Sequence, residues 1–169
     1  MSPVAAPEES LQRTAEEFQA AVADLVRIYQ FRDRDRICCY DVSVTQCYAL
    51  ETLVAAGPLR LGELASRLYL DKSTTSRVVQ ALVRKGYVAQ RPDPSDRRAM
   101  TVSATRKGET LCARISDELV DQQKTLLRDL DPDVRNGVVR VLRKLADAAD
   151  VRFRAGGAAC CSVEPGERC

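Results

Sequence analysis

The chain has 169 residues, and its 45% hydrophobic and 30% charged residues are typical of a globular protein rather than a disordered or fibrous one. At roughly 100 to 200 residues per domain, this length predicts a single compact domain. No apolar stretch approaches the roughly 20 residues needed to cross a bilayer, and residues 1–10 contain neither a basic nor an apolar leader region. These features predict a cytoplasmic protein with no membrane partner.

Charge is distributed unevenly along the chain. The formal net charge is only +2, but residues 60–107 contain 11 Lys or Arg against 4 Asp or Glu, which leaves that segment at +7 and the rest of the chain at −5. A basic segment of this kind is typical of a surface that meets nucleic acid. The simpler alternative is a solvated basic face.

The chain has seven Cys and no His. The absence of His excludes Ser-His-Asp and Cys-His catalysis and His-containing zinc sites. Cys47 is a conceivable nucleophile, but no general base, Gly-rich phosphate loop or Cys-x-x-Cys motif accompanies it. We therefore predict that the protein is not an enzyme, and that its cysteines serve metal or redox chemistry rather than a disulfide framework.

Two segments carry apolar residues at steps of three and four, the spacing of a heptad seam on a long helix. The first ends at the charged stretch 32–36, and the second follows Asp131-Pro132, where an N-cap and a first-turn proline start a helix. Both seams predict helices that need a partner. Their positions are Leu11, Ala15, Phe18, Val22, Leu25 and Tyr29 in the first, and Val134, Val138, Val141, Leu145 and Ala149 in the second.

A further helix is predicted to begin after Ser43. Ser43 and Gln46, three residues later, match a capping box, and Gly57-Pro58 ends the helical pattern. Cys47 therefore lies in the first turn, where the positive end of the helix dipole favours a thiolate.

A helix-turn-helix followed by a β-hairpin is predicted next. A short helix over 59–70 leads to Asp71, which is well placed to N-cap a helix over 72–85. Two strand-like runs, 87–91 and 99–104, flank a long basic turn and predict a hairpin of the kind called a wing. A last long helical stretch precedes the second seam.

The polar face of the helix over 72–85 is the candidate DNA contact. In a helix-turn-helix the second helix enters the major groove, where Arg77 suits guanine and Ser73 and Thr74 suit phosphates. An Arg at the wing tip suits the minor groove. The candidate contacts are Lys72, Ser73, Thr74, Ser76, Arg77 and Gln80 on the helix, with Arg97 and Arg98 on the wing.

Two motifs resemble the MarR family of winged-helix repressors. Residues 71–77, Asp-Lys-Ser-Thr-Thr-Ser-Arg, resemble the opening of its recognition helix. Residues 96–108, Asp-Arg-Arg-Ala-Met-Thr-Val-Ser-Ala-Thr-Arg-Lys-Gly, resemble its wing, although Ala104 stands where family members often have Leu. The order of predicted elements matches the family over nearly the whole chain.

The resemblance implies a mainly α fold with a small β-hairpin wing, and an obligate homodimer whose first and last helices interlock. It also implies a repressor of near-palindromic double-stranded DNA, although activation stays open. Asp96 would orient the wing and Arg98 would enter the minor groove. The chain would then comprise an N-terminal dimerisation helix (1–36), the winged helix-turn-helix region (37–108), C-terminal dimerisation helices (109–154) and a cysteine-containing tail (155–169).

The cysteines form two groups with the same interval, a Cys-Cys pair followed eight residues later by a third Cys. Soft thiolates select soft acceptors, and three of them match a trigonal metalloid best, because structural zinc and iron-sulfur sites usually take four ligands. We expect no cofactor to be required for the fold, and an effector that is As(III) or another soft metal or metalloid. The first candidate site is Cys38, Cys39 and Cys47, and a second possible cluster is Cys160, Cys161 and Cys169.

Three alternatives remain. The cysteines could simply pack as small apolar side chains, the interpretation favoured for Cys112. Cys38 or Cys39 could instead form a sulfenate and then a disulfide, as in a peroxide-sensing regulator of the same family. A dimeric interaction protein would explain the seams, but it leaves the basic helix and wing unexplained.

Overall fold

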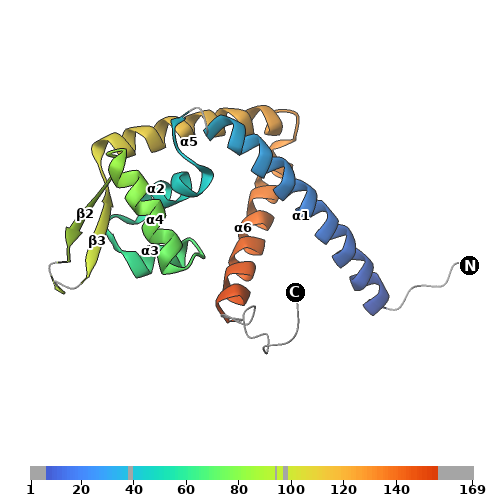
Figure 1. Ribbon diagram of the computed structural model, residues 1–169. Coiled ribbons are helices and arrows are strands. Elements are labelled where there is room, and N and C mark those ends of the chain that lie inside the picture. The colour runs from blue at the N-terminus through green and yellow to red at the C-terminus, as the bar shows by residue number, and fades with distance from the viewer. Residues whose placement is uncertain (1–6, 38–39, 94, 97–98, 156–169) are drawn as a thin grey trace, which may run out of the picture. The chain divides into compact units, whose positions relative to one another are not determined.

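The computed structural model describes residues 7–37, 40–93, 95–96 and 99–155, without the side chains of residue 7 and residues 31–37. The chain divides into two compact units, residues 1–118 and 119–169, and each is described by itself. The predicted mainly helical fold with a small β-sheet is confirmed (Figure 1). The elements are α1 (Pro7–Ile37), α2 (Val44–Ala56), β1 (Leu59–Arg60), α3 (Leu61–Arg67), α4 (Lys72–Arg84), β2 (Val88–Pro92), β3 (Met100–Ala104), α5 (Arg106–Leu127) and α6 (Pro132–Ala155).

Helix α2 begins at the predicted capping box. The Gln46 backbone N–H donates to Ser43 Oγ at 3.2 Å, and the Ser43 backbone N–H donates to Gln46 Oε1 at 3.3 Å. Two N–H groups that would lack partners at a helix start are satisfied in this way. The helix ends at Gly57, whose φ of +78° is a conformation that a side chain would strain.

The wing hairpin pairs with a third strand that the sequence did not predict. β2 and β3 are antiparallel, with Gln90 opposite Val102, and β1 adds to the outer edge of β3, with Leu59 opposite Val102. We expected one helix over 59–70, whereas α3 starts only at Leu61. A two-residue strand is too short to show a hydrophobic period, and its pairing partner lies about forty residues away in the chain. The sequence at residues 59 and 60 therefore gave no sign of a strand.

The core of the first unit lies between α2, α3, α4 and the sheet. α4 turns Thr75, Val79 and Leu82 inward, and all three side chains are fully buried. The other side chains of this core share near-complete burial and come from α2, α3 and β3: Leu50, Leu53, Leu64 and Val102.

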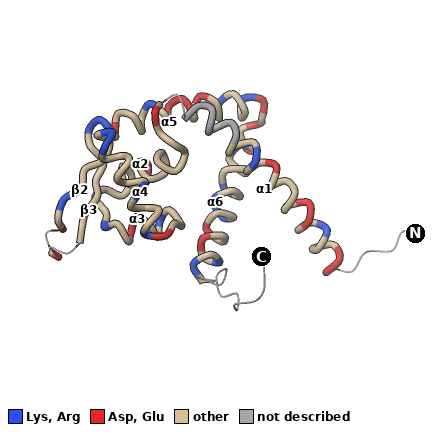
Figure 2. Tube along the Cα trace, in the orientation of Figure 1, with Lys and Arg blue, Asp and Glu red and all other residues tan. Residues whose placement is uncertain are grey.

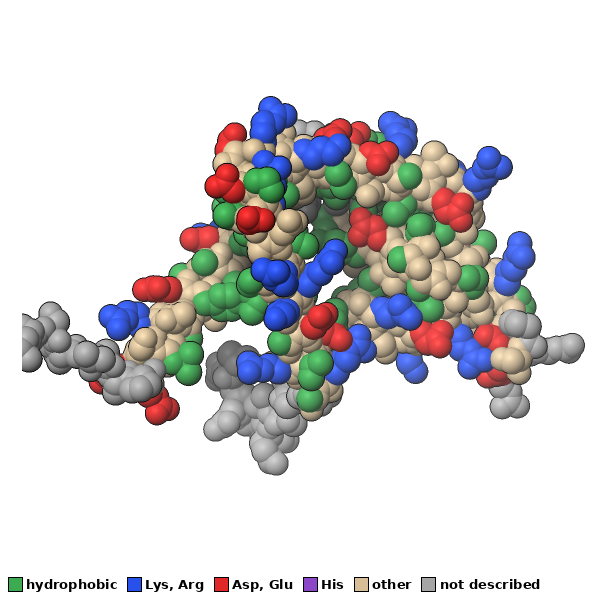
Figure 3. All heavy atoms as spheres, turned by 180° about the vertical axis from the view of Figure 1, so that it is seen from behind, with side chains coloured by type: hydrophobic (Ala, Val, Ile, Leu, Met, Phe, Trp, Pro, Cys, Tyr) green, Lys and Arg blue, Asp and Glu red, His purple; other side chains and the backbone are tan. Residues whose placement is uncertain are grey.

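Helices α1 and α6 expose the seams that the sequence predicted. In α1, Phe18 and Leu25 are 47% and 45% exposed, and apolar side chains lie at the surface of this helix (Figure 3). No residue of α6 is buried, and Val141 is 53% exposed. Within the described ranges, no helix is both long and apolar enough to span a membrane.

Candidate nucleic-acid interface

The first turn of α4 is held by Asp71, the predicted N-cap. Its carboxylate accepts hydrogen bonds from the Thr74 backbone N–H at 2.8 Å, from Thr74 Oγ1 at 2.6 Å and from Ser73 Oγ at 2.7 Å. The hydroxyl of Ser73, then the hydroxyl and backbone N–H of Thr74, hold the pKa of Asp71 well below its usual range. The cap therefore stays ionised at neutral pH and keeps these hydrogen bonds.

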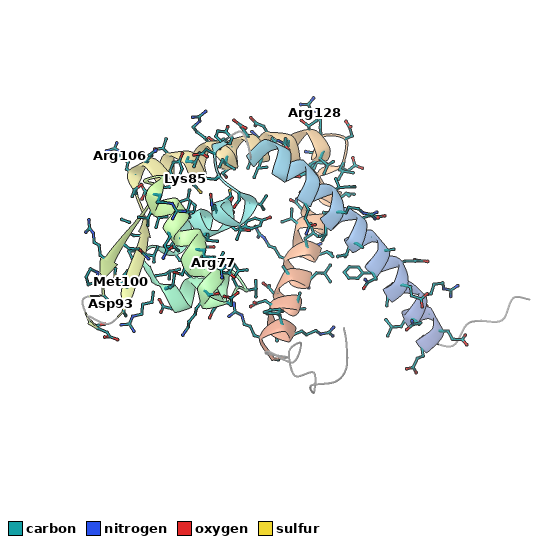
Figure 4. All side chains as sticks on the ribbon, viewed as in Figure 1. Arg77, Lys85, Asp93, Met100, Arg106 and Arg128 are labelled. Atoms are coloured by element: carbon teal, nitrogen blue, oxygen red, sulfur yellow. The ribbon has the colours of Figure 1, made fainter. Side chains whose placement is uncertain are left out.

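The predicted contact residues of α4 lie outside its buried stripe. Lys72, Ser73, Arg77 and Gln80 are exposed, and Thr74 and Ser76 are partly buried. Arg77 lies about midway along α4 (Figure 4). This arrangement leaves a cationic and polar helix face available for a DNA groove.

The structure adds a constraint on two of these residues. The hydroxyl groups of Ser73 and Thr74 donate to Asp71, so their oxygens retain only lone pairs. Phosphate oxygens accept hydrogen bonds but cannot donate them. The phosphate contacts expected of Ser73 and Thr74 stay a prediction, and such contacts would require these hydroxyls to leave the cap.

Asp93 organises the base of the wing turn. Its buried carboxylate accepts from Arg60 Nε at 2.8 Å and Arg60 Nη2 at 3.1 Å, a two-pronged ion pair. It also accepts from the Ser95 backbone N–H at 2.9 Å, Ser95 Oγ at 2.6 Å and the Asp96 backbone N–H at 3.1 Å. Thr101 Oγ1 on β3 completes the set at 3.1 Å. Arg60, then Ser95, hold the pKa of Asp93 well below its usual range.

This role of Asp93 was missed by sequence analysis, which assigned wing orientation to Asp96. The side-chain role of Asp96 stays a prediction, while its backbone N–H is one of the groups that Asp93 holds. The bond from Asp93 to the N–H two residues later is an Asx turn, which the Asp-Pro-Ser order could have indicated. The partner Arg60 gave no sequence signal, because it lies 33 residues away on β1.

Arg97 and Arg98 lie outside the described residues, so their contact with the minor groove stays a prediction. The described part of the basic segment carries Lys and Arg on β2 and where α4, β2 and α5 meet (Figure 2). Cations grouped in this way attract DNA phosphates, and such attraction is weakened by salt.

Of the predicted cysteine ligands, only Cys47 lies within the residues that the structure describes. Cys38, Cys39, Cys160, Cys161 and Cys169 lie outside the described residues. Cys47 is only 1% exposed, and its Sγ donates to Glu51 Oε1 at 3.5 Å. Among the side chains that the structure describes, no three of His, Cys, Asp or Glu are grouped so that they could hold a metal ion.

Cys112 is the other described cysteine, and it also lies close to Glu51. Burial, and then the charge of Glu51, raise the pKa of the Cys112 thiol. A buried thiol whose ionisation is disfavoured is unreactive. This environment agrees with the interpretation of Cys112 as a packing residue.

Several known proteins resemble this chain in sequence or in fold. The sequence profile of the MarR family matches residues 40–99. An uncharacterised HTH-type transcriptional regulator of Mycobacterium leprae is 31% identical over 144 residues, covering 83% of this chain and 98% of the relative. The structure of a MarR family protein from Bacillus stearothermophilus has a TM-score of 0.75 at 25% identity, over 82% of this chain and 96% of that one.

One similar solved structure contains DNA. A mutant of MarR from E. coli, complexed with operator DNA, has a TM-score of 0.65 at 22% identity, over 76% of this chain and 93% of that one. At this level of identity the likeness concerns the fold.

Proposed function

The chain belongs to the MarR family of winged helix-turn-helix transcriptional regulators, and on that premise we propose that it is a homodimeric repressor released from its operator when a thiophilic metalloid binds its cysteine thiolates. Membership makes it a DNA-binding regulator rather than an enzyme. The observation that carries the proposal is the exposed cationic face of α4, held by the Asp71 cap beside a wing whose base Asp93 organises.

The homodimer is supported by the seams of α1 and α6. Phe18, Leu25, Val141 and Leu145 are each between 40% and 53% exposed in the single chain, at positions with heptad spacing. Exposed apolar stripes on long helices gain stability by packing against another helix surface. A second copy of the chain supplies such surfaces in a two-fold arrangement.

A two-fold dimer predicts a near-palindromic operator. Each protomer presents one recognition helix, and two such helices address half-sites about 34 to 36 Å apart, one turn of DNA. Occupying such a site blocks transcription when it overlaps a promoter, which makes repression the expected output. The similar E. coli MarR mutant was solved with operator DNA.

The proposed effector is trivalent arsenic, bound by Cys38, Cys39 and Cys47. Cys38 and Cys39 immediately precede the described segment that starts at Tyr40, and Cys47 follows in the first turn of α2. Three sulfurs and no His suit a trigonal thiophilic ion. The tail cysteines Cys160, Cys161 and Cys169 are the second proposed cluster.

The burial of Cys47 gives this proposal a mechanism. Its sulfur is covered in the described conformation, so a ligand reaches it only after a local rearrangement. A ligand that binds the opened form better shifts the population toward that form. A preference of about 1 to 3 kcal/mol changes DNA affinity roughly 5- to 150-fold, enough for a switch.

Two experiments test the proposal. The first measures binding of the reduced protein to an operator duplex at several salt concentrations, for the wild type and Arg98→Ala. We expect specific binding that weakens steeply with salt, and weaker binding by Arg98→Ala with or without effector. A monomer that ignores duplex DNA at low salt contradicts the whole proposal.

The second experiment titrates the protein–DNA complex with arsenite. We expect release from the wild type, no release from Cys47→Ser despite normal DNA binding, and wild-type release from the matched control Cys112→Ser. Release by hydroperoxide that a thiol reverses, together with no response to low arsenite, would show the redox alternative instead. A Cys47→Ser protein that cannot bind DNA would make Cys47 a structural residue.

A further inference from the structure

Helix α4 ends in a Schellman motif, a pair of hydrogen bonds formed around one residue in the left-handed conformation. The Gly86 N–H donates to the Val83 carbonyl oxygen at 2.9 Å, and the Tyr87 N–H donates to the Leu82 carbonyl oxygen at 3.0 Å. Gly86 has φ of +74°. Glycine adopts this conformation without strain because it has no Cβ atom.

Helix α3 ends in the same motif, but a tyrosine takes the place of the glycine. The Tyr69 N–H donates to the Ser66 carbonyl oxygen at 3.4 Å, and the Leu70 N–H donates to the Ala65 carbonyl oxygen at 3.0 Å. Tyr69 has φ of +54°, which is unfavourable for a bulky residue. Its side chain is nevertheless 50% exposed. Strain of this kind is found most often at functional sites, so the tyrosine calls for a functional explanation.

Tyr69 lies directly before the turns of α4 that address DNA. Asp71, the N-cap of α4, follows two residues later, and the exposed Lys72 begins the helix. Three residues span at most about 11 Å, so Tyr69 stays close to this helix start. A recognition helix enters the major groove by its first turns, and phosphates line both edges of that groove. The residues just before such a helix therefore lie near the DNA backbone.

The two hydroxyl groups in the first turn of α4 are already used as donors. Ser73 Oγ and Thr74 Oγ1 both donate to Asp71. A phosphate oxygen needs a donor, and a phenol hydroxyl can donate. Tyrosine is one of the side chains that bind DNA phosphates. Tyr69 thus offers a hydroxyl donor at this helix start without disturbing the cap.

We propose that Tyr69 is a DNA-binding residue whose hydroxyl donates a hydrogen bond to a backbone phosphate beside the recognition helix. This inference rests on the proposed function, of which it uses DNA binding and not the cysteine chemistry. A phosphate contact fixes the orientation of the protein on DNA without reading the base sequence. Tyrosine is neutral and releases no counterion, so this contact leaves the salt dependence of binding unchanged.

The first test compares Tyr69→Phe, which removes only the hydroxyl, with Tyr48→Phe, a matched control on α2 whose tyrosine is 52% exposed. Fluorescence anisotropy measures binding to a duplex that the wild type has selected from a random pool, and to an unrelated duplex of the same length. We expect Tyr69→Phe to weaken binding to both duplexes by a similar factor, about 3- to 30-fold, with an unchanged salt slope. Tyr48→Phe should bind like the wild type.

The second test uses Tyr69→Gly to separate binding from folding. Glycine relieves the left-handed strain, so the melting temperature should rise by roughly 2 to 4 °C. Affinity for both duplexes should fall at least as far as in Tyr69→Phe. A variant that is more stable and binds more weakly would show that the tyrosine serves DNA binding at a cost to the fold.

Several results would overturn the inference. These are wild-type affinity in Tyr69→Phe, an equal loss in Tyr48→Phe, and a loss confined to the selected duplex, which would indicate a base contact. A Tyr69→Gly protein that melts below the wild type would assign the tyrosine to the fold and overturn the inference as well. If Tyr69→Phe does not fold, Tyr69→Gly decides, and wild-type affinity in that variant is the contrary result.

Failure of the inference differs from failure of the proposed function. If the wild type binds neither duplex at low salt, the proposed function fails and the inference fails with it. If the wild type binds and the Tyr69 variants bind equally well, the inference alone is rejected.

Discussion

The region from α2 to β3 buries many of its apolar side chains, whereas the helices α1 and α6 expose theirs. Leu53 and Leu82, in the first region, are no more than 1% exposed, whereas Phe18 of α1 and Val141 of α6 are about half exposed. The first region is stabilised by burial within one chain. The two helices have exposed apolar faces, so in the proposed homodimer their stability would depend on assembly and on protein concentration.

The largest effect is expected in the internal core. Leu82→Ala removes a fully buried side chain of α4 and leaves a cavity, which should lower the free energy of unfolding by about 2 to 5 kcal/mol. Chemical denaturation at two protein concentrations measures this loss. The neighbouring variant Val83→Ala, at a residue 37% exposed, is the matched control and should cost much less. Equal losses in both variants would show that α4 does not pack as described.

A smaller, concentration-dependent effect is expected on α6. Val141→Glu places a charge in the exposed seam and should weaken the homodimer by about 1.4 to 3 kcal/mol, roughly 10- to 150-fold in dissociation constant. Analytical ultracentrifugation measures the change. Lys144→Glu alters charge on the same helix outside the seam and should leave the dimer nearly intact. If both variants dimerise like the wild type, the seam of α6 is not the dimer contact.

The smallest effect is a pH dependence confined to the DNA-binding region. Both Asp71 and Asp93 have a folded-state pKa below the ordinary value of 3.8, because Ser73 and Thr74 bond the first and Arg60 bonds the second. Their stabilisation is fully present above that value and is lost as the pH falls below it.

We therefore expect Asp93→Asn to be less stable than the wild type at neutral pH, and the difference to shrink as the pH is lowered from about 5 to 2. Denaturation curves at each pH measure the two free energies of unfolding. Parallel pH profiles for the wild type and the variant would mean that the bonds to Arg60 do not depend on the charge of Asp93.

Much of the local structure could be predicted because its causes lie within a few residues. The cap at Ser43 depends on Gln46 three residues away, and the cap at Asp71 depends on Thr74 three residues away. Heptad spacing likewise identified α1 and α6 as helices with apolar seams. The MarR-type architecture followed from the order of these elements and from two short motifs.

Features with distant partners were not predictable in the same way. β1 exists because Leu59 and Arg60 pair with β3, and Asp93 organises the wing because Arg60 reaches it from that strand. The hydrogen bond from Lys85 Nζ to the Asp41 carbonyl oxygen likewise joins residues 44 positions apart. Nothing in the spacing of these residues indicates that they meet.

The amino-acid order alone therefore predicted the helices apart from the start of α3, the caps of α2 and α4, and the polar face of α4, and it contains the two groups of cysteines. The folded chain decided which apolar residues are buried, which carboxylate organises the wing and that Cys47 is covered beside Glu51. The physical reason is range: capping and helical periodicity act over three or four residues, whereas burial and ion pairing depend on which distant segments the tertiary packing brings together.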